Sequence, residues 1–284
     1  MKTGGSTTSN ILMRYGISNN LHTFSYSTKN LNCFNSTVFD FMAIHMRYNR
    51  TWMNNSVPDA KYLTILRSPF GQLPSAFYFF KFARPLLNST DPFRQYIEHL
   101  DSYHNFTEVH HQHRNGQMWF LNPEFEDEDQ DNVTMIKRAI RRIDREMDFV
   151  IILDHYDESL VVLKQIMCWE DEDIIYHITK KSKQKRNPMT TSMKTNIRKW
   201  SLADTLLFDH FNLSLWEKVA NYDGDFNADL ERFRSKNLKA SLECSHKKIY
   251  SAGTYCWKLI NDTPRLRLFA LNQQRWESNE NKCV

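Results

Sequence analysis

The chain has 284 residues and a formal net charge of +4, from 37 lysines and arginines against 33 aspartates and glutamates. Hydrophobic residues make up 41% of it, which is ample for one large core, while only 7 glycines argue against a turn-rich all-β protein. The mild positive charge suits an anionic ligand better than a nucleic acid, and no apolar run reaches the roughly 18 residues that would span a bilayer.

The first predicted element is a helix over residues 6–15, with Gly16 as its end, and the segment before it has the composition of an anion cradle. We call residues 2–7 the Gly-Gly segment; it contains Lys2, Thr3, Gly4, Gly5, Ser6 and Thr7. Two glycines permit a turn whose N–H groups point inward, and the helix start adds unpaired N–H groups and partial positive charge. A simple helix cap is the alternative, and the lysine precedes the glycines, unlike that of a kinase P-loop.

Two strands are predicted next, over residues 21–26 and 38–46, and the second ends at His45. Residues 61–78, which we call the Arg67 segment, predict a buried strand over Tyr62–Leu66, a turn at Ser68-Pro69 and a helix from Leu73. This order places Arg67 at the carboxyl end of a strand and Ser75 in the first turn of the next helix. Ligands of open parallel sheets bind at this edge, so an anion site is expected there.

The rest of the chain predicts an α/β fold with helices around a parallel sheet. The continuous apolar run at 149–153 is typical of a strand that is covered on both faces. Residues 180–199, which are basic and polar, predict a mobile loop. Helices are expected over residues 92–103, 133–147, 159–169, 172–178, 200–220 and 227–248.

The cysteines and histidines show no metal-ligand spacing, so no metal is predicted. Cys168 lies in an apolar stretch and is expected to be a buried thiol, and Cys244 and Cys256 could form a disulfide in an oxidising compartment. The other cysteines are Cys33 and Cys283, and the clustered histidines are His104, His110, His111 and His113.

The two anion-binding segments together resemble the 5′-phosphosulfate loop and the 3′-phosphate motif of sulfotransferases that use 3′-phosphoadenosine-5′-phosphosulfate (PAPS). The Gly-Gly segment, followed by Asn10-Ile11-Leu12, is similar to the loop of the galactose-3-O-sulfotransferase family, which includes galactosylceramide sulfotransferase. Further family landmarks follow in order at residues 45–49, 64–75, 157–169 and 209–219. The resemblance covers residues 1–220 of a single 1–284 domain, with a helical extension over residues 221–284.

This resemblance implies the P-loop-like sulfotransferase fold and transfer of sulfate from PAPS to a galactose hydroxyl, the 3-OH, of a glycolipid or glycoprotein glycan. The Gly-Gly segment would hold the 5′-phosphosulfate, with Lys2 stabilising the leaving phosphate. Arg67 and Ser75 would bind the 3′-phosphate, and His45 would be the base. The structural alternatives are an Arg67 salt bridge at the strand edge and a His45 ring that only fills the core.

The chain also departs from the family pattern. The family has a supporting strand and a histidine directly before the lysine, where this chain has Met1, and Ser68 and Pro74 replace an aspartate and a glutamate. A catalytically silent relative that binds a ligand or glycan is therefore the alternative function.

The resemblance also implies a Golgi membrane location, with a lumenal domain and an amino-terminal anchor that is absent from this sequence. The number of Asn-x-Ser/Thr sequons favours the same compartment. Their asparagines are Asn35, Asn49, Asn54, Asn88, Asn105, Asn132, Asn212 and Asn261.

Overall fold

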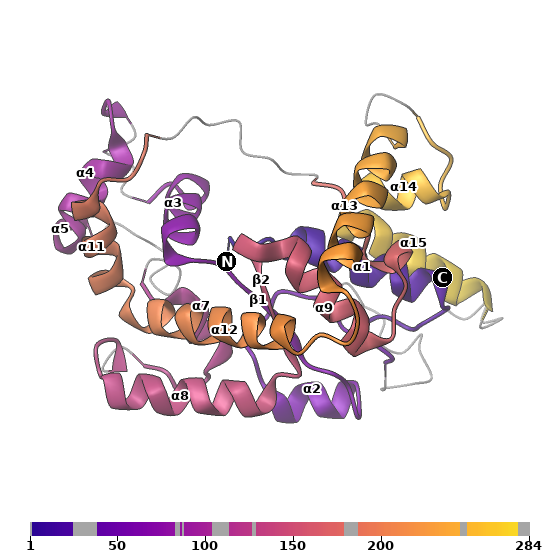
Figure 1. The fold of residues 1–284 in the computed structure, drawn as a ribbon, viewed down its shortest axis with the longest axis horizontal. Helices are drawn as coiled ribbons and strands as arrows, with labels where there is room; N and C mark the ends of the chain where they lie inside the picture. The colour runs from indigo at the N-terminus through magenta and orange to yellow at the C-terminus, as the bar shows by residue number, and fades with distance from the viewer. Residues whose placement is uncertain are drawn as a thin grey trace.

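The computed structural model describes residues 2–24, 39–82, 86, 88–103, 114–126, 129–178, 187–244 and 249–277. In these ranges the protein is mostly helical around a small parallel sheet of two strands (Figure 1). The four clustered histidines, Cys33 and Cys283 lie outside the described residues, so the structure does not place them.

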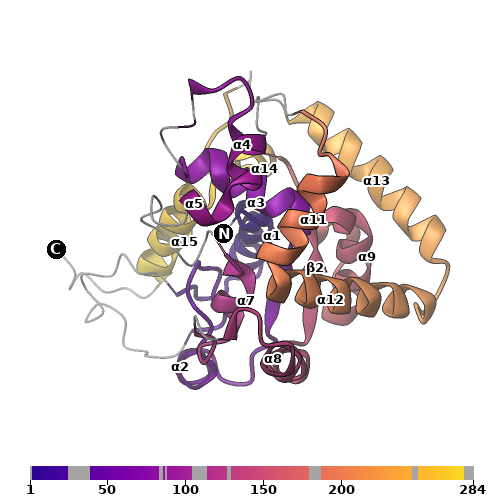
Figure 2. The same cartoon turned by 90° about the vertical axis from the view of Figure 1, so that its left-hand side faces the viewer.

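The sheet joins the two strands that the apolar runs predict. β1 (Leu63–Leu66) pairs in parallel with β2 (Phe149–Ile152), with Leu63 opposite Phe149 and Leu66 opposite Ile152. Every residue of β2 is buried, as expected for a strand that is covered on both faces. α9 (Tyr156–Met167) and α12 (Leu202–Ala220) pack against β2, and α8 (Val133–Glu146) lies beside α12 (Figure 2).

Neither of the two strands predicted before β1 forms in the described parts of residues 21–26 and 38–46. Thr23 and Phe41 form one isolated parallel bridge, and residues 42–49 have no regular secondary structure. Residues 25–38 lie outside the described part of the chain. The apolar residues of 41–46 line a pocket. The hydrophobic run therefore marks a pocket wall and not a strand that is buried in a sheet.

Helices account for the remaining regular structure. The first is α1 (Gly5–Ser18), which continues past Gly16, so this glycine does not end the helix as predicted. Gly16 is buried, and its lack of a side chain lets the Phe41 ring approach the helix closely. The other helices are α2 (Arg50–Ser56), α3 (Pro69–Phe80), α4 (Pro92–Glu98), α5 (Leu100–Tyr103), α7 (Gly116–Leu121), the 3-10 turn η5 (Leu153–His155), α10 (Asp171–Ile174), α11 (Thr191–Trp200), α13 (Phe226–Glu243), α14 (Tyr255–Ile260) and α15 (Thr263–Glu277).

The basic stretch predicted as a loop contains a helix. The Thr190 side chain caps α11 by accepting a hydrogen bond from Met193 N–H (3.2 Å), and Met193 and Ile197 are buried against the core formed by α3 and α4. The charged residues hide this narrow apolar stripe in the sequence. The helix predicted over 172–178 is also shorter than expected, because α10 ends at Ile174.

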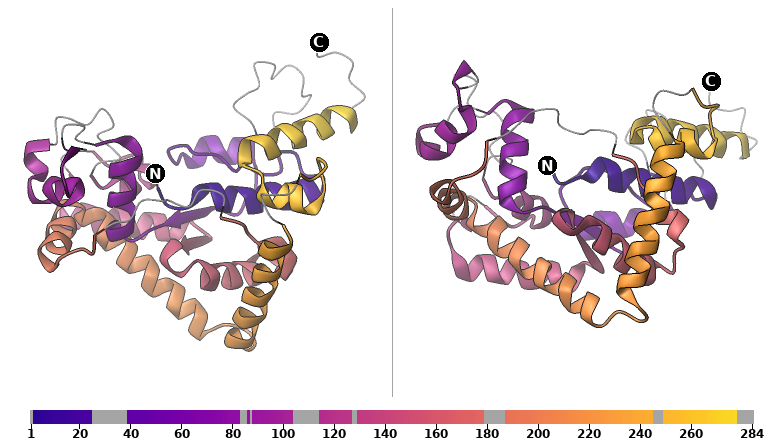
Figure 3. Two further views of the ribbon diagram at one scale, coloured as in Figure 1. Left: turned by 90° about the horizontal axis from the view of Figure 1, so that it is seen from above. Right: turned by 45° about the horizontal axis from the view of Figure 1, so that its top comes forward.

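The carboxyl-terminal helices close onto the start of the chain. α3, α4, α5 and α11 gather at one end of the molecule and α13 to α15 at the other (Figure 3). α15 packs along α1, and the buried Asn10 side chain of α1 donates to Asn261 O (2.8 Å).

Cys244 and Cys256 form the disulfide that their positions allowed. Cys168, predicted to be buried, is an exposed free thiol just after α9.

Candidate functional site

The Gly-Gly segment forms a turn that leads directly into α1. Gly4 precedes the helix in a left-handed conformation (φ 89°), which glycine adopts without the steric cost of a side chain. A Cβ atom at Gly4 would lie 2.6 Å from Leu153 Cδ1, just after β2. Thr7 N–H donates to Gly4 O (3.0 Å), which closes the first turn of α1. Because the first N–H groups of a helix have no carbonyl partner within it, this helix start is a candidate anion site.

The Arg67 segment leaves the same edge and begins α3 at once. Ser68 caps the helix by accepting a hydrogen bond from Phe70 N–H (3.3 Å), and Pro69 occupies the first helical position. The predicted separate turn at Ser68-Pro69 is therefore wrong, and Ser75 lies in the second turn of α3, not the first. Ser68 N–H donates to Asp154 Oδ2 (2.9 Å), which ties the start of α3 to the end of β2.

The structure brings the two segments together. Arg67 Nη1 donates to the backbone carbonyl of Lys2 (3.3 Å), and the Lys2 ammonium lies 3.9 Å from the centroid of the Phe79 ring. The Arg67 guanidinium also passes over Gly71, where a Cβ atom would lie 2.5 Å from Arg67 Nε. Positions 71, 75 and 79 follow at four-residue spacing on one face of α3, so Ser75 lies between the contacts of Arg67 and Lys2.

His45 lies beside the Gly-Gly segment, but not at the end of a strand. Its side chain is exposed, and a Cβ atom at Gly5 would lie 2.6 Å from His45 Cε1. The pKa of His45 is below its ordinary value, because neighbouring protein atoms partly desolvate the ring and because positive charges, including Arg267 and Lys2, lie nearby. The imidazole is therefore neutral at neutral pH and able to accept a proton.

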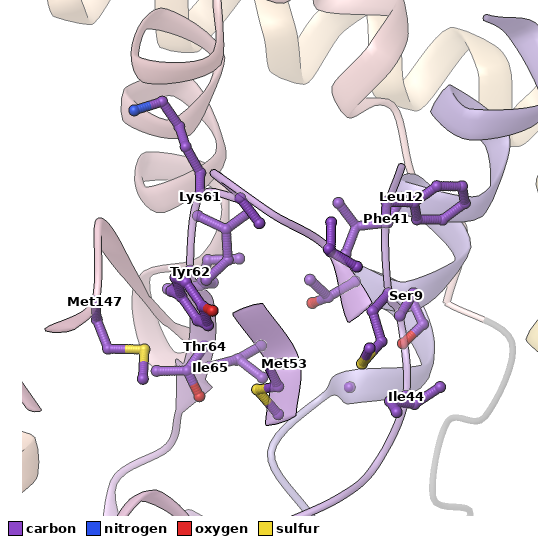
Figure 4. Close-up of a pocket in the computed structure, with 18 of the residues that line it drawn as sticks. Ser9, Leu12, Phe41, Ile44, Met53, Lys61, Tyr62, Thr64, Ile65 and Met147 are labelled. Carbon is purple, nitrogen blue, oxygen red and sulfur yellow. The ribbon is translucent and has the colours of Figure 1, made fainter. Parts of the chain in front are cut away.

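A pocket of about 500 Å³ borders this site between β1 and the irregular residues 40–48 (Figure 4). In the close-up, Lys61, Tyr62, Thr64 and Ile65 form one wall, and Ser9, Leu12, Phe41 and Ile44 form the wall across from them. Thr3, Gly5 and His45 also line the pocket, so it opens beside the Gly-Gly segment. Most of its lining is apolar.

Sequence reasoning missed three residues of the site. Asp154 directly follows the predicted strand 149–153. Its position at the carboxyl end of that strand could have indicated that it belongs to the site. Gln117 and Asp204 lie in helices far along the chain. The Gln117 side chain holds the backbone of Arg67, and the Asp204 carboxylate holds Gln117, which no local pattern indicates. Buried amides and carboxylates resemble surface residues in a sequence, because their partners come from elsewhere.

Comparison with known families decides the relationship. The chain matches the family described as Galactose-3-O-sulfotransferase over residues 1–250. It belongs to this family. Galactosylceramide sulfotransferase of Mus musculus is 26% identical over 236 residues, which cover 77% of this chain and 56% of the relative. The Homo sapiens protein of that name is 27% identical over 237 residues, with the same coverage of both chains.

A second branch of the family is equally distant. Galactose-3-O-sulfotransferase 2 of Homo sapiens is 25% identical over 211 residues, covering 72% of this chain and 53% of the relative. The chain thus spans a little over half the length of the curated relatives it matches. No solved structure gives a significant match to the chain. The small parallel sheet and the surrounding helices are consistent with the family.

Among the described ranges, no helix is both long and apolar enough to cross a lipid bilayer. The part of the chain that the structure describes holds no group of three or more His, Cys, Asp or Glu side chains that could bind a metal ion.

Proposed function

We propose that this family member transfers sulfate from PAPS to the 3-OH of a galactose-terminated glycolipid or glycan. The contact between Arg67 and Lys2 supports the proposal, because it joins the Gly-Gly segment to the Arg67 segment and so brings two candidate anion sites together. The donor set fits a ligand with two separated anionic groups. The start of α1 with Ser6 and Thr7 suits a phosphosulfate, and a guanidinium with a nearby hydroxyl suits a 3′-phosphate.

Each residue has a distinct task in this mechanism. PAPS supplies the sulfuryl group when bound. Lys2 would leave the Phe79 ring and neutralise the charge that develops on the departing phosphate oxygen. The acceptor oxygen forms its bond to sulfur as the bond from sulfur to that phosphate oxygen breaks, and His45 takes the hydroxyl proton. His45 and the pocket lie on the same side of the Gly-Gly segment, from which the acceptor would approach.

Calorimetry with adenosine 3′,5′-bisphosphate and adenosine 5′-phosphate tests the donor assignment. The bisphosphate should bind more tightly than the monophosphate. In a separate transfer assay, incubation of the protein with PAPS and a β-galactoside should yield a product with sulfate on the 3-OH. Donor binding without transfer to any galactose acceptor would instead support a silent, ligand-binding relative. If neither nucleotide binds, both versions fail.

The His45 base predicts a particular pH dependence. His45→Ala should lower kcat by roughly one to two orders of magnitude, because proton removal is late and the base contributes less than a typical general base. Because the pKa of His45 is lowered, the ring loses its neutral form only at a pH below the ordinary value of about 6.5, so the acidic limb of the wild-type kcat profile should lie below that value.

His22→Ala is the matched control, since His22 is exposed, is paired with Asp40 (3.3 Å) and does not line the pocket. Near-normal turnover of His45→Ala between pH 5 and 8, with an unchanged melting temperature, would eliminate His45 as the base.

We also propose an oxidising, lumenal location for the domain. The Cys244–Cys256 disulfide supports it, as does the exposure of four sequon asparagines: Asn49, Asn54, Asn88 and Asn132. Asn261 is buried and its side chain donates to Trp257 O (2.7 Å), so that sequon is not open to modification in this fold.

A further inference from the structure

Gln117 makes a paired contact with the backbone of Arg67. Arg67 N–H donates to Gln117 Oε1 (2.8 Å), and Gln117 Nε2 donates to Arg67 O (2.9 Å). The side-chain amide therefore pairs both polar groups of the residue directly after β1. Gln117 is fully buried, so both bonds are shielded from water. The position of the Arg67 backbone is set by α7, which is 50 residues further along the chain.

Asp204 in turn holds Gln117. Its carboxylate accepts hydrogen bonds from Met118 N–H (2.8 Å) and Gln117 N–H (3.1 Å), and it also lies 3.5 Å from Gln117 Nε2. Asp204 is 2% exposed, and burial raises its pKa to about 6. The group is thus mostly ionised at neutral pH, the state in which both oxygens accept. α12, which carries Asp204, packs on β2, so the chain of contacts starts at the centre of the fold.

The fixed backbone determines where the guanidinium can reach. Arg67 extends over Gly71 and donates to Lys2 O, at the boundary between the two anion-binding segments. We infer that Gln117, held by Asp204, is a positioning residue that aims Arg67 at the 3′-phosphate of the donor. The inference rests on the proposed function and adds two residues to its site that do not touch the donor.

The chemistry of the contact makes the amide specific. Methionine at position 117 would fill the same volume, but it would leave Arg67 N–H and C=O without these partners. Glutamate would lose the donor to Arg67 O and place a second carboxylate beside Asp204. Only an amide of this length can donate and accept in parallel here.

The test compares two nucleotides on the whole chain by calorimetry. Gln117→Met should weaken adenosine 3′,5′-bisphosphate about tenfold and leave adenosine 5′-phosphate nearly unchanged, a selectivity loss that simple destabilisation would not produce. In an Arg67→Ala background, Gln117→Met should cause no further loss of selectivity. Thr205→Val is the matched control, because it removes a buried hydrogen bond to Ser201 O (2.8 Å) from the neighbouring residue of α12.

The outcomes separate this inference from the proposed function. If the wild-type chain does not prefer the bisphosphate, both fail. If Arg67→Ala removes the preference while Gln117→Met keeps it, the positioning role alone is overturned. Hydrogen exchange of the nucleotide-free wild-type chain gives a further test that needs no variant. Slow exchange at Arg67 N–H supports the paired contact with Gln117, and exchange at the rate of an open loop contradicts it.

Discussion

Replacing Lys2 with alanine should lower kcat for sulfate transfer by about 10³-fold, the upper range for loss of one group that stabilises developing charge. The ammonium lies 3.9 Å from the centroid of the Phe79 ring, a contact that is weaker than a charge-assisted hydrogen bond to a phosphate. Negative charge on the departing oxygen grows as the bond to sulfur breaks, so Lys2 helps the transition state more than the bound donor. Initial rates with saturating PAPS and calorimetry of donor binding measure the two effects separately.

Lys239→Ala provides the control for lost lysine charge. Lys239 is exposed on α13, pairs with Glu243 (3.9 Å) and does not line the pocket. Its replacement should change kcat little. A Lys2→Ala variant whose donor KM rises while kcat stays normal would show that Lys2 only binds the donor.

Arg67→Lys should weaken binding of adenosine 3′,5′-bisphosphate by about 10²-fold, with a much smaller effect on adenosine 5′-phosphate. A guanidinium can hold a phosphate through two parallel hydrogen bonds, whereas an ammonium acts as a point charge. Lysine at this position would also lose the contact that Arg67 Nη1 makes with Lys2 O, which joins the two segments. Titration calorimetry at one fixed salt concentration gives both affinities.

Arg94→Lys repeats the same chemical change at an exposed arginine that pairs with Glu98 (2.8 Å) on α4. It should leave both nucleotide affinities unchanged. Equal weakening of both nucleotides by Arg67→Lys would contradict a 3′-phosphate contact and favour a structural role at the end of β1.

Several elements could be predicted because their signals act over a few residues. The apolar run of β2 and the spacing of Ile136, Ile140 and Ile143 on α8, by four and then three residues, both proved to mark buried faces. The glycine turn and the strand end at Arg67 were recognised for the same reason, since turn residues and strand ends depend on the local backbone. The types of side chain in the candidate site were therefore visible in the sequence.

Longer-range features were not visible. α11 was predicted to be a loop because its two buried residues pack in a cluster with α3 and α4, which precede it by about a hundred residues. His45 was expected at a strand end because an apolar run alone does not distinguish a sheet strand from the wall of a pocket.

The sequence by itself determined that a glycine turn before the first helix and a strand-end arginine exist, and that the chain resembles one sulfotransferase family. Only the tertiary structure decided that Lys2 and Arg67 meet, and that Gln117 and Asp204 hold the arginine from α7 and α12. The physical reason is that periodicity reports contacts within a turn or a strand. Hydrogen bonds between buried polar groups are satisfied across 50 to 90 residues, and they leave no local pattern.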